Sequence, residues 1–156
     1  MVFTADGLID KVTPTHSGPD FVQRNVTVPD AVLTASSQRE ALTGPERAAD
    51  DNYTTRWAAA TNANGGWLRL DFKDSLDLTR VEILPEYAWK PYRFAVEVSA
   101  NGQTWTKIAD FTKDPVSGSP ITVEKSVRAQ HLRIVFPEDV KGRDISLFEV
   151  RTFQRR

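Results

Sequence analysis

The feature that most constrains the fold of this chain is a series of short segments in which every second residue is apolar. From residue 30 onward each segment spans about four to eight residues, a length and period typical of β-strands with one buried face. The alternating positions are Leu68, Leu70 and Phe72; Val81 and Ile83; Phe94, Val96 and Val98; Ile121 and Val123; Leu132, Ile134 and Phe136; and Ile145 and Leu147 with Val150.

Glycine, asparagine and proline mark the connections between these segments, at residues 64–66, 101–102, 117–120 and 141–144. Many short strands joined by such turns predict a sandwich or a barrel. A helical pattern is confined to Ser37–Arg47, where Pro45 limits it to about one turn. We therefore expect an all-β fold in which residues 30–156 form one module.

Residues 1–29 differ from the rest of the chain. Prolines and a glycine interrupt residues 13–19, and few apolar side chains there are available for burial. This stretch is predicted to be a linker or the tail of a preceding domain, with a short strand around Phe21–Val28.

Charge and composition narrow the classes of partner. The 20 basic and 21 acidic residues nearly cancel, which argues against nucleic acid or an anionic membrane, since both favour a basic surface. Cysteine is absent, so disulfide and thiolate chemistry are excluded. No segment approaches the roughly 18 apolar residues of a membrane helix.

Four segments, taken in order, carry a resemblance to a known family: Ala48–Trp57, Gly66–Phe72, Phe94–Trp105, and Ala129–Ile134 closed by Ile145–Val150. Over about Ala31 to Phe153 the chain resembles the coagulation factor 5/8 type C, or discoidin, domain, and within it the bacterial carbohydrate-binding modules of family 32. The resemblance implies a discoidin-like jelly-roll sandwich of two antiparallel sheets, a galactose-binding-like fold. The family usually has glycine where Asp51 stands, and aspartate tolerates a positive φ better than most residues.

Framework positions follow from the same comparison. Trp57, Trp67 and Trp105 lie among apolar residues at strand ends, so we expect all three to pack in the core. His131 lies where the family often has an aromatic residue, and a framework role is expected for it. Neither this histidine nor any sequence motif indicates an active site, and the chain is expected not to be an enzyme.

The resemblance also implies a structural calcium ion. Calcium prefers six to eight oxygen ligands, and the polar turn around residues 47–55 is where the family holds a metal. Carried over to this sequence, the ligands are a carboxylate oxygen of Asp50 and Glu149, backbone oxygens of Arg47, Asn52 and Phe148, and the hydroxyl and carbonyl of Thr55. The alternative is that Asp50 and Asn52 only accept hydrogen bonds from turn amides.

Loops at one end of the sandwich bind sugar in this family, and an exposed aromatic residue in a loop is the signal to look for. The segment Pro85–Tyr92 offers Trp89 and Tyr87 as aromatic surfaces, with Lys90, Glu86 and Arg93 as hydrogen-bonding neighbours. Secondary candidates are Gln38, Arg39, Glu40, Asn62 and Asn64. The alternative for Tyr87 and Trp89 is that they cap the core or meet another domain. The His, Arg and Asn arrangement of galactose-binding members is not found.

These residues lead to three competing hypotheses. In the first, the chain is a monomeric, non-catalytic module that binds a glycan or polysaccharide. Its stretch Ala5–Thr15 resembles the closing segment of five-bladed propeller hydrolases such as glycoside hydrolase family 43, so we expect it to be tethered to a catalytic domain of a bacterial enzyme that is secreted, periplasmic or on the cell surface. In the second, the chain is a structural or protein-interaction domain without a sugar site. The third, lipid binding, ranks last because the loop Ala58–Gly66 lacks apolar tips and basic neighbours.

Overall fold

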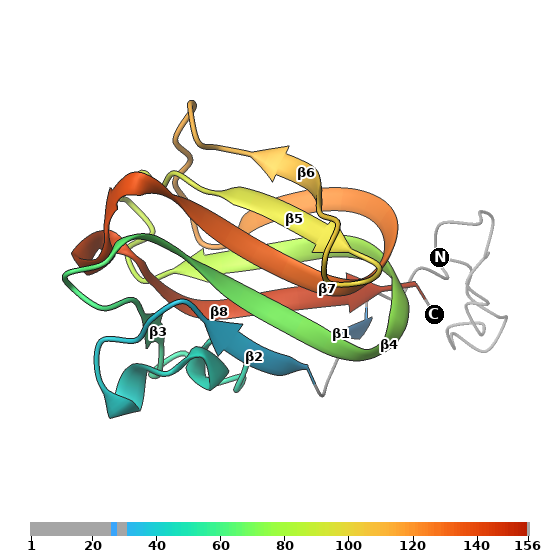
Figure 1. Cartoon of the computed structure of the whole chain (residues 1–156), viewed down its shortest axis with the longest axis horizontal. Coiled ribbons are helices and arrows are strands. Elements are labelled where there is room, and N and C mark those ends of the chain that lie inside the picture. The colour runs from blue at the N-terminus through green and yellow to red at the C-terminus, as the bar shows by residue number, and fades with distance from the viewer. Residues whose placement is uncertain (1–25, 28–30, 156) are drawn as a thin grey trace, which may run out of the picture.

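The computed structural model describes residues 26–27 and 31–155 (Figure 1). Its strands are β1 (Val26–Thr27), β2 (Val32–Ala35), β3 (Trp57–Ala58), β4 (Asn64–Pro85), β5 (Ala95–Ser99), β6 (Thr106–Asp110), β7 (Ile121–Lys141) and β8 (Ser146–Gln154). The strand expected around Phe21–Val28 is described only at β1, and its other residues lie outside the described part of the chain.

The helical hint after β2 becomes two short 3-10 helices, η2 (Ala41–Thr43) and η3 (Pro45–Ala48), and a third, η4 (Gly142–Asp144), joins β7 to β8. Pro45 stands at the start of η3, where a proline needs no hydrogen-bond donor. Within the described residues, none of the helices has the length and hydrophobicity needed to span a bilayer.

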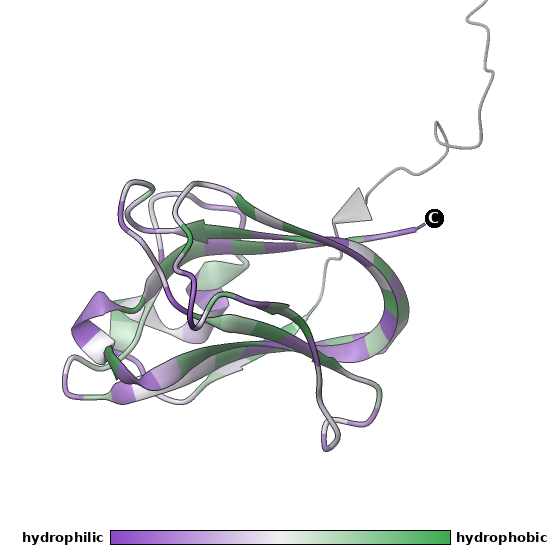
Figure 2. Ribbon diagram, turned by 90° about the horizontal axis from the view of Figure 1, so that it is seen from above, coloured by the Kyte–Doolittle hydropathy of each residue, from purple (hydrophilic) through white to green (hydrophobic). Residues whose placement is uncertain are grey.

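Two long strands determine the architecture. β4 and β7 pair antiparallel along most of their length, with Leu70 opposite Leu132 and Val81 opposite Val123, and the register shifts between Asp71 and Leu76. At that irregularity both strands curve from one layer into the other, as Figure 2 shows from above. Such an irregularity is how a sheet turns a corner without losing its pairing.

Each half of the β4–β7 pair organises one layer. The first half of β4 pairs with β2, and the facing part of β7 pairs with β5, which pairs with β6. The second half of β4 pairs with β8, which also carries β1 and β3. The two layers are therefore one antiparallel sheet folded over on itself, and the predicted all-β jelly-roll sandwich is confirmed.

The core lies between the layers and contains the alternating residues of the sequence pattern. All of those positions are buried, with exposed fractions of 6% or less. Along the strands of both layers, apolar residues alternate with polar ones (Figure 2). This is the arrangement expected when one face of each strand meets the opposite sheet.

The tryptophans do not all join this core. Trp57 is fully buried and its indole nitrogen donates to the carbonyl of Ser37 at 3.0 Å. Trp67, however, is 36% exposed, and Trp105 is half-buried with the Arg133 guanidinium 4.1 Å from its ring centroid. The prediction was wrong for Trp67 because its neighbour Leu68 points inward, so that Trp67 must point outward. It was wrong for Trp105 because this side chain, which precedes β6, stacks against the outer face of the sheet.

The loops that matter for function gather at one end. The connection after β4, the η2–η3 segment and the β7–β8 turn lie together there, while the C-terminus lies at the opposite end (Figure 1). Hydrogen bonds hold them in place: the Gly142 amide donates to the Ala63 carbonyl at 2.8 Å, and the Glu86 amide donates to the Ser146 carbonyl at 3.3 Å.

Candidate functional site

Two aromatic side chains project from the loop that follows β4. Trp89 is 79% exposed and Tyr87 is 43% exposed. Their ring centroids are 5.9 Å apart and the ring planes are inclined at 52°. We call Tyr87 and Trp89 the aromatic platform. Because they lie in solvent, their apolar surface is available to a ligand.

The backbone of this loop is anchored although its tip is exposed. The Gly118 amide donates to the Ala88 carbonyl at 2.8 Å. The Tyr87 amide donates to the hydroxyl of Tyr92, a residue that is only 3% exposed. Burial of this phenol raises its pKa and keeps it protonated over the physiological range. The platform is thus held on the rigid sandwich before any ligand arrives.

Charged groups border the platform. The Lys90 ammonium lies 5.9 Å from the ring centroids of both Tyr87 and Tyr92. It is 2.6 Å from a carboxylate oxygen of Asp144 in η4. The Glu86 carboxylate is directed elsewhere, to the Arg56 guanidinium at 3.3 Å. The Lys90–Asp144 pair therefore supplies hydrogen-bonding groups beside the platform.

Arg93, also predicted for the site, is engaged with other groups. Its guanidinium donates to the Thr112 carbonyl at 2.7 Å and to the Asp139 carboxylate at 2.6 Å. This guanidinium lowers the pKa of the Asp139 carboxyl. Arg93 therefore braces the loop after β6.

The secondary candidates lie at the same end of the sandwich as the platform, but they do not come together in a single site. Arg39 donates to the carbonyls of Gly142 and Arg143 at 3.3 and 3.2 Å and so clamps the β7–β8 turn. Glu40 forms a capping box with Thr43. The Asn64 side-chain oxygen accepts from Lys141 at 2.8 Å, and Asn62 is exposed.

Asp144, which the structure places against Lys90, and its neighbour Arg143 were not among the residues predicted for the site. The segment 141–144 was identified only as a turn, and Asp144 is separated from Lys90 by 54 residues. The only available signal was a charged pair of residues directly after a turn glycine. Nothing in the sequence placed that turn against the loop after β4.

The predicted metal ligands around residue 50 form a tight polar loop. The Thr55 hydroxyl donates to the Asp50 carboxylate at 2.6 Å and lies 3.0 Å from the Asn52 carbonyl. The Asn52 amide donates to the other Asp50 oxygen at 3.1 Å. Asp51 has a φ of 54°, so this aspartate takes a left-handed conformation at a position where the family usually has glycine.

The last strand meets this loop through Glu149. One oxygen of its carboxylate accepts from the Asp51 amide at 3.1 Å, across 98 residues of sequence. The other oxygen is buried and has no hydrogen-bond partner. Burial raises the pKa of Glu149 to about 7, and the nearby Asp50 and Asp51 carboxylates add to the effect.

This arrangement fits a cation. A buried carboxylate oxygen without a donor is costly, and a calcium ion would satisfy it. In the described part of the chain no three His, Cys, Asp or Glu side chains come together as a metal site. A cation here would therefore need carbonyl and hydroxyl oxygens beside Asp50 and Glu149. Arg47 extends its guanidinium to 3.9 Å from Asp50, and Phe148 directly precedes Glu149 on β8.

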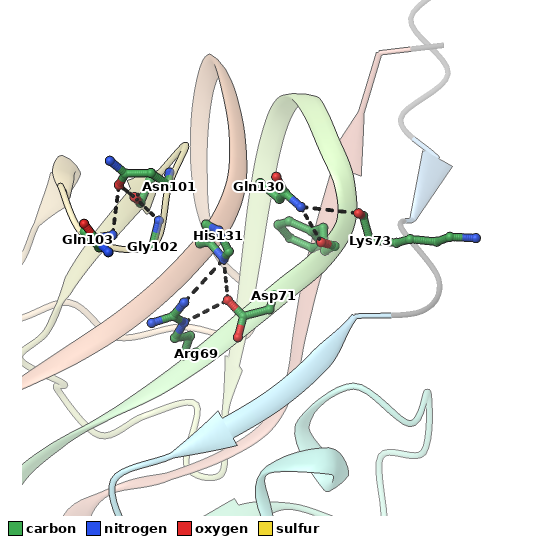
Figure 3. Close-up of polar contacts among 10 residues, drawn as sticks. Arg69, Asp71, Lys73, Asn101, Gly102, Gln103, Gln130 and His131 are labelled. Atoms are coloured by element: carbon green, nitrogen blue, oxygen red, sulfur yellow. Dashed lines mark hydrogen bonds and ion pairs between the residues drawn. The ribbon is translucent and has the colours of Figure 1, made fainter.

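A row of polar residues crosses the outer face of the other layer. Asp71, His131 and Ser99 lie opposite one another on β4, β7 and β5. Figure 3 shows Asp71, His131 and Arg69 pointing toward one another. The His131 ring nitrogen Nδ1 contacts the Asp71 carboxylate, to which Arg69 also donates at 2.8 Å.

This row resembles a Ser–His–Asp triad only in composition. Ser99 is 4% exposed. Its hydroxyl donates to the Asn101 side chain and accepts from the Gly102 amide at 2.8 Å. A nucleophile needs a hydrogen bond to its base, whereas these bonds fix the β5–β6 turn. His131 therefore has the framework role expected for it, although on a polar face.

Comparison with known proteins identifies the family. A family model described as the F5/8 type C domain matches residues 32–150. The chain belongs to the F5/8 type C domain family. This result confirms the resemblance drawn from the four sequence segments. A comparison with curated proteins found no match.

Solved structures similar to this F5/8 type C domain include carbohydrate-binding modules. Chitosan-binding module 1 from a chitosanase/glucanase of Paenibacillus sp. IK-5 is 25% identical with a TM-score of 0.70, over 82% of this chain and 97% of that one. The module CpGH89CBM32-5 of Clostridium perfringens, in complex with GalNAc-beta-1,3-galactose, is 24% identical with a TM-score of 0.68, over 82% and 99%. A protein named only as a glycoside hydrolase is 22% identical with a TM-score of 0.72, over 97% of this chain and 38% of that one.

Glu149 gives this F5/8 type C domain a testable pH dependence. In a chelating buffer the free energy of unfolding should fall as the pH rises from about 4.5 to about 7. Over that window Glu149 holds its proton when folded and loses it when unfolded, so stability is present at the acid end and lost as pH rises. The fall should be on the order of 2 kcal/mol, measured by urea denaturation.

Glu149→Gln should remove this fall, because a neutral amide does not titrate. Glu124→Gln, at an exposed position of β7, is the control and should leave the pH dependence intact. Identical pH profiles for the unmodified chain and Glu149→Gln would contradict the prediction.

Proposed function

We propose that this domain binds carbohydrate and that the aromatic platform is its binding surface. The observation that carries the proposal is the 79% exposure of Trp89. A tryptophan buries more apolar area than almost any other side chain, and a site that leaves it in solvent forgoes that stabilisation. Such residues mark binding sites on soluble proteins. The sugar ligands named for similar modules support a glycan as the partner.

The geometry suits a pyranose ring. The apolar face of the sugar would pack on the Trp89 indole, with Tyr87, inclined at 52° to it, contacting an edge. The Lys90 ammonium and the Asp144 carboxylate would exchange hydrogen bonds with sugar hydroxyls. Because the loop backbone is already anchored, little conformational entropy would be lost on binding.

We propose further that the domain is a monomeric accessory module of a secreted bacterial glycoside hydrolase. The likeness to modules of carbohydrate-active enzymes supports this context. A tethered module raises the effective concentration of a catalytic domain at its polysaccharide. The polysaccharide substrates of such enzymes lie outside the cell, which supports a secreted, periplasmic or cell-surface location.

A structural calcium ion is proposed for the loop at residues 47–55. Asp50, Asn52 and Thr55 would hold it from the loop and Glu149 from β8, with backbone oxygens of Arg47 and Phe148 completing the set. Bound calcium would neutralise the buried carboxylate and join an early loop to the last strand. A ligand that binds only the folded state stabilises it by mass action.

Substitution of Trp89 tests the sugar proposal. Trp89→Ala should abolish retention on a glycan array, because the apolar surface beneath the sugar ring is removed. Thermal stability should stay unchanged, since the side chain is mostly in solvent. Trp67→Ala, which removes a partly exposed tryptophan from the sheet face, is the size-matched control and should bind normally.

Unchanged glycan binding by Trp89→Ala would remove Trp89 from the site. If the unmodified domain bound no glycan at all, the proposal would fail. The exposed aromatic pair would then favour the protein-interaction alternative.

Calcium binding is tested by melting temperature. Addition of a chelator should lower the melting temperature of the unmodified domain by several degrees, which corresponds to about 1–2 kcal/mol for a domain of this size. Asp50→Ala should melt at the chelated temperature and should no longer respond to calcium. Asp77→Ala, at an exposed position on β4, is the control. A melting temperature of the unmodified domain that is unchanged by both chelator and calcium would contradict the proposal.

A further inference from the structure

The turn beside the aromatic platform is held rigidly while one of its side chains stays free. A Cβ atom on Gly142 would lie 1.8 Å from the Ala60 carbonyl oxygen, so this turn packs directly on the 60–63 loop. Arg39 clamps the same turn through two carbonyls. The Arg143 side chain, in contrast, is 74% exposed. A free side chain on a fixed backbone is well placed to receive a ligand.

The charges around Asp144 do not balance. Asp144 lies between two cations: the Lys90 ammonium at 2.6 Å and the Arg143 guanidinium at 3.9 Å. The Lys90 contact is short, while the Arg143 contact is at the limit of an ion pair. One positive charge is therefore left over, and it belongs mainly to Arg143.

Three other arginines at this end of the molecule are occupied. Arg56 pairs with Glu86, and Arg93 pairs with Asp139. Arg39 is used by the two backbone carbonyls. Arg143, in contrast, adjoins the Asp144 that pairs with Lys90 and retains its donors for an incoming group. An arginine fork matches the two oxygens of a carboxylate.

We infer that the platform takes an acidic sugar, a uronic-acid residue of a glycan, and that Arg143 binds its carboxylate. The inference rests on the proposed function, since it names the class of sugar for the same site. The pyranose lies on Trp89, and its carboxylate points toward the β7–β8 turn. Asp144 keeps Lys90 in place beside the platform and disfavours a second acidic group at the same point.

Calorimetric titration with matched ligands tests this inference. The probes are trigalacturonate, its fully methyl-esterified counterpart, which is neutral, and chitotriose. Trigalacturonate should bind about five- to tenfold more tightly than its ester, since an exposed charge-assisted contact contributes a factor of that size. The preference should shrink in high salt, which screens exposed charges.

Variants assign the preference to one residue. Arg143→Gln should bind trigalacturonate and its ester equally, with the affinity for the ester unchanged. Arg128→Gln is the matched control and should keep the preference. Arg128 is 65% exposed on the first half of β7 and pairs with Asp77 on the second half of β4.

The outcomes distinguish failure of the acidic-sugar inference from failure of the proposed function. Equal binding of the acid and the ester by the unmodified domain, or tighter binding of chitotriose, would overturn the inference and leave the sugar proposal standing. An unchanged preference in Arg143→Gln would also overturn it. If no carbohydrate bound under any condition, the proposed function and the inference would both fail.

Discussion

The structure depends on the pairing of β4 with β7 on both sides of the bend near residues 71–76. These two strands share their hydrogen bonds from one layer of the sandwich to the other, and β2, β5 and β8 each add to one of them. The bend near residues 71–76 closes the two layers over a single core. The interior is therefore filled by the packing of alternate side chains, and binding is left to the loops at the ends.

The same pairing explains where the chemistry lies. One end of the sandwich brings the loop after β4 against the β7–β8 turn, so that Lys90 meets Asp144 although they are far apart in sequence. The loop around Asp50 reaches Glu149 on β8. Both contacts join an irregular segment to a rigid strand or turn. A ligand bound by these loops can thus be positioned by a scaffold that does not itself change shape.

The alternation of apolar residues was sufficient to predict an all-β sandwich or barrel, because a strand with one buried face is apolar at every second residue. The jelly-roll sandwich itself was implied by the family resemblance. The family resemblance, and not the alternation, indicated Trp89 in a binding loop and Glu149 beside the loop around Asp50. Neither could show that Arg93 would be engaged by Asp139, or that Asp144 would meet Lys90 beside the platform. Those facts depend on how distant loops pack, which local patterns do not encode. The predictions for Trp67 and Trp105 were wrong because they relied on the large apolar area of the side chains. Trp67 alternates with the buried Leu68 and therefore points outward, and Trp105 lies just before β6.

The central claim is that a glycan binds at the loop end of the sandwich and not on the outer face of a sheet. Titration of isotopically labelled protein with a soluble oligosaccharide, followed by amide chemical shifts, tests it most directly. The account predicts that the largest shifts fall on residues 86–92 and 142–144, together with the Trp89 indole. Shifts centred on Trp105 and His131, with residues 86–92 unmoved, would contradict it.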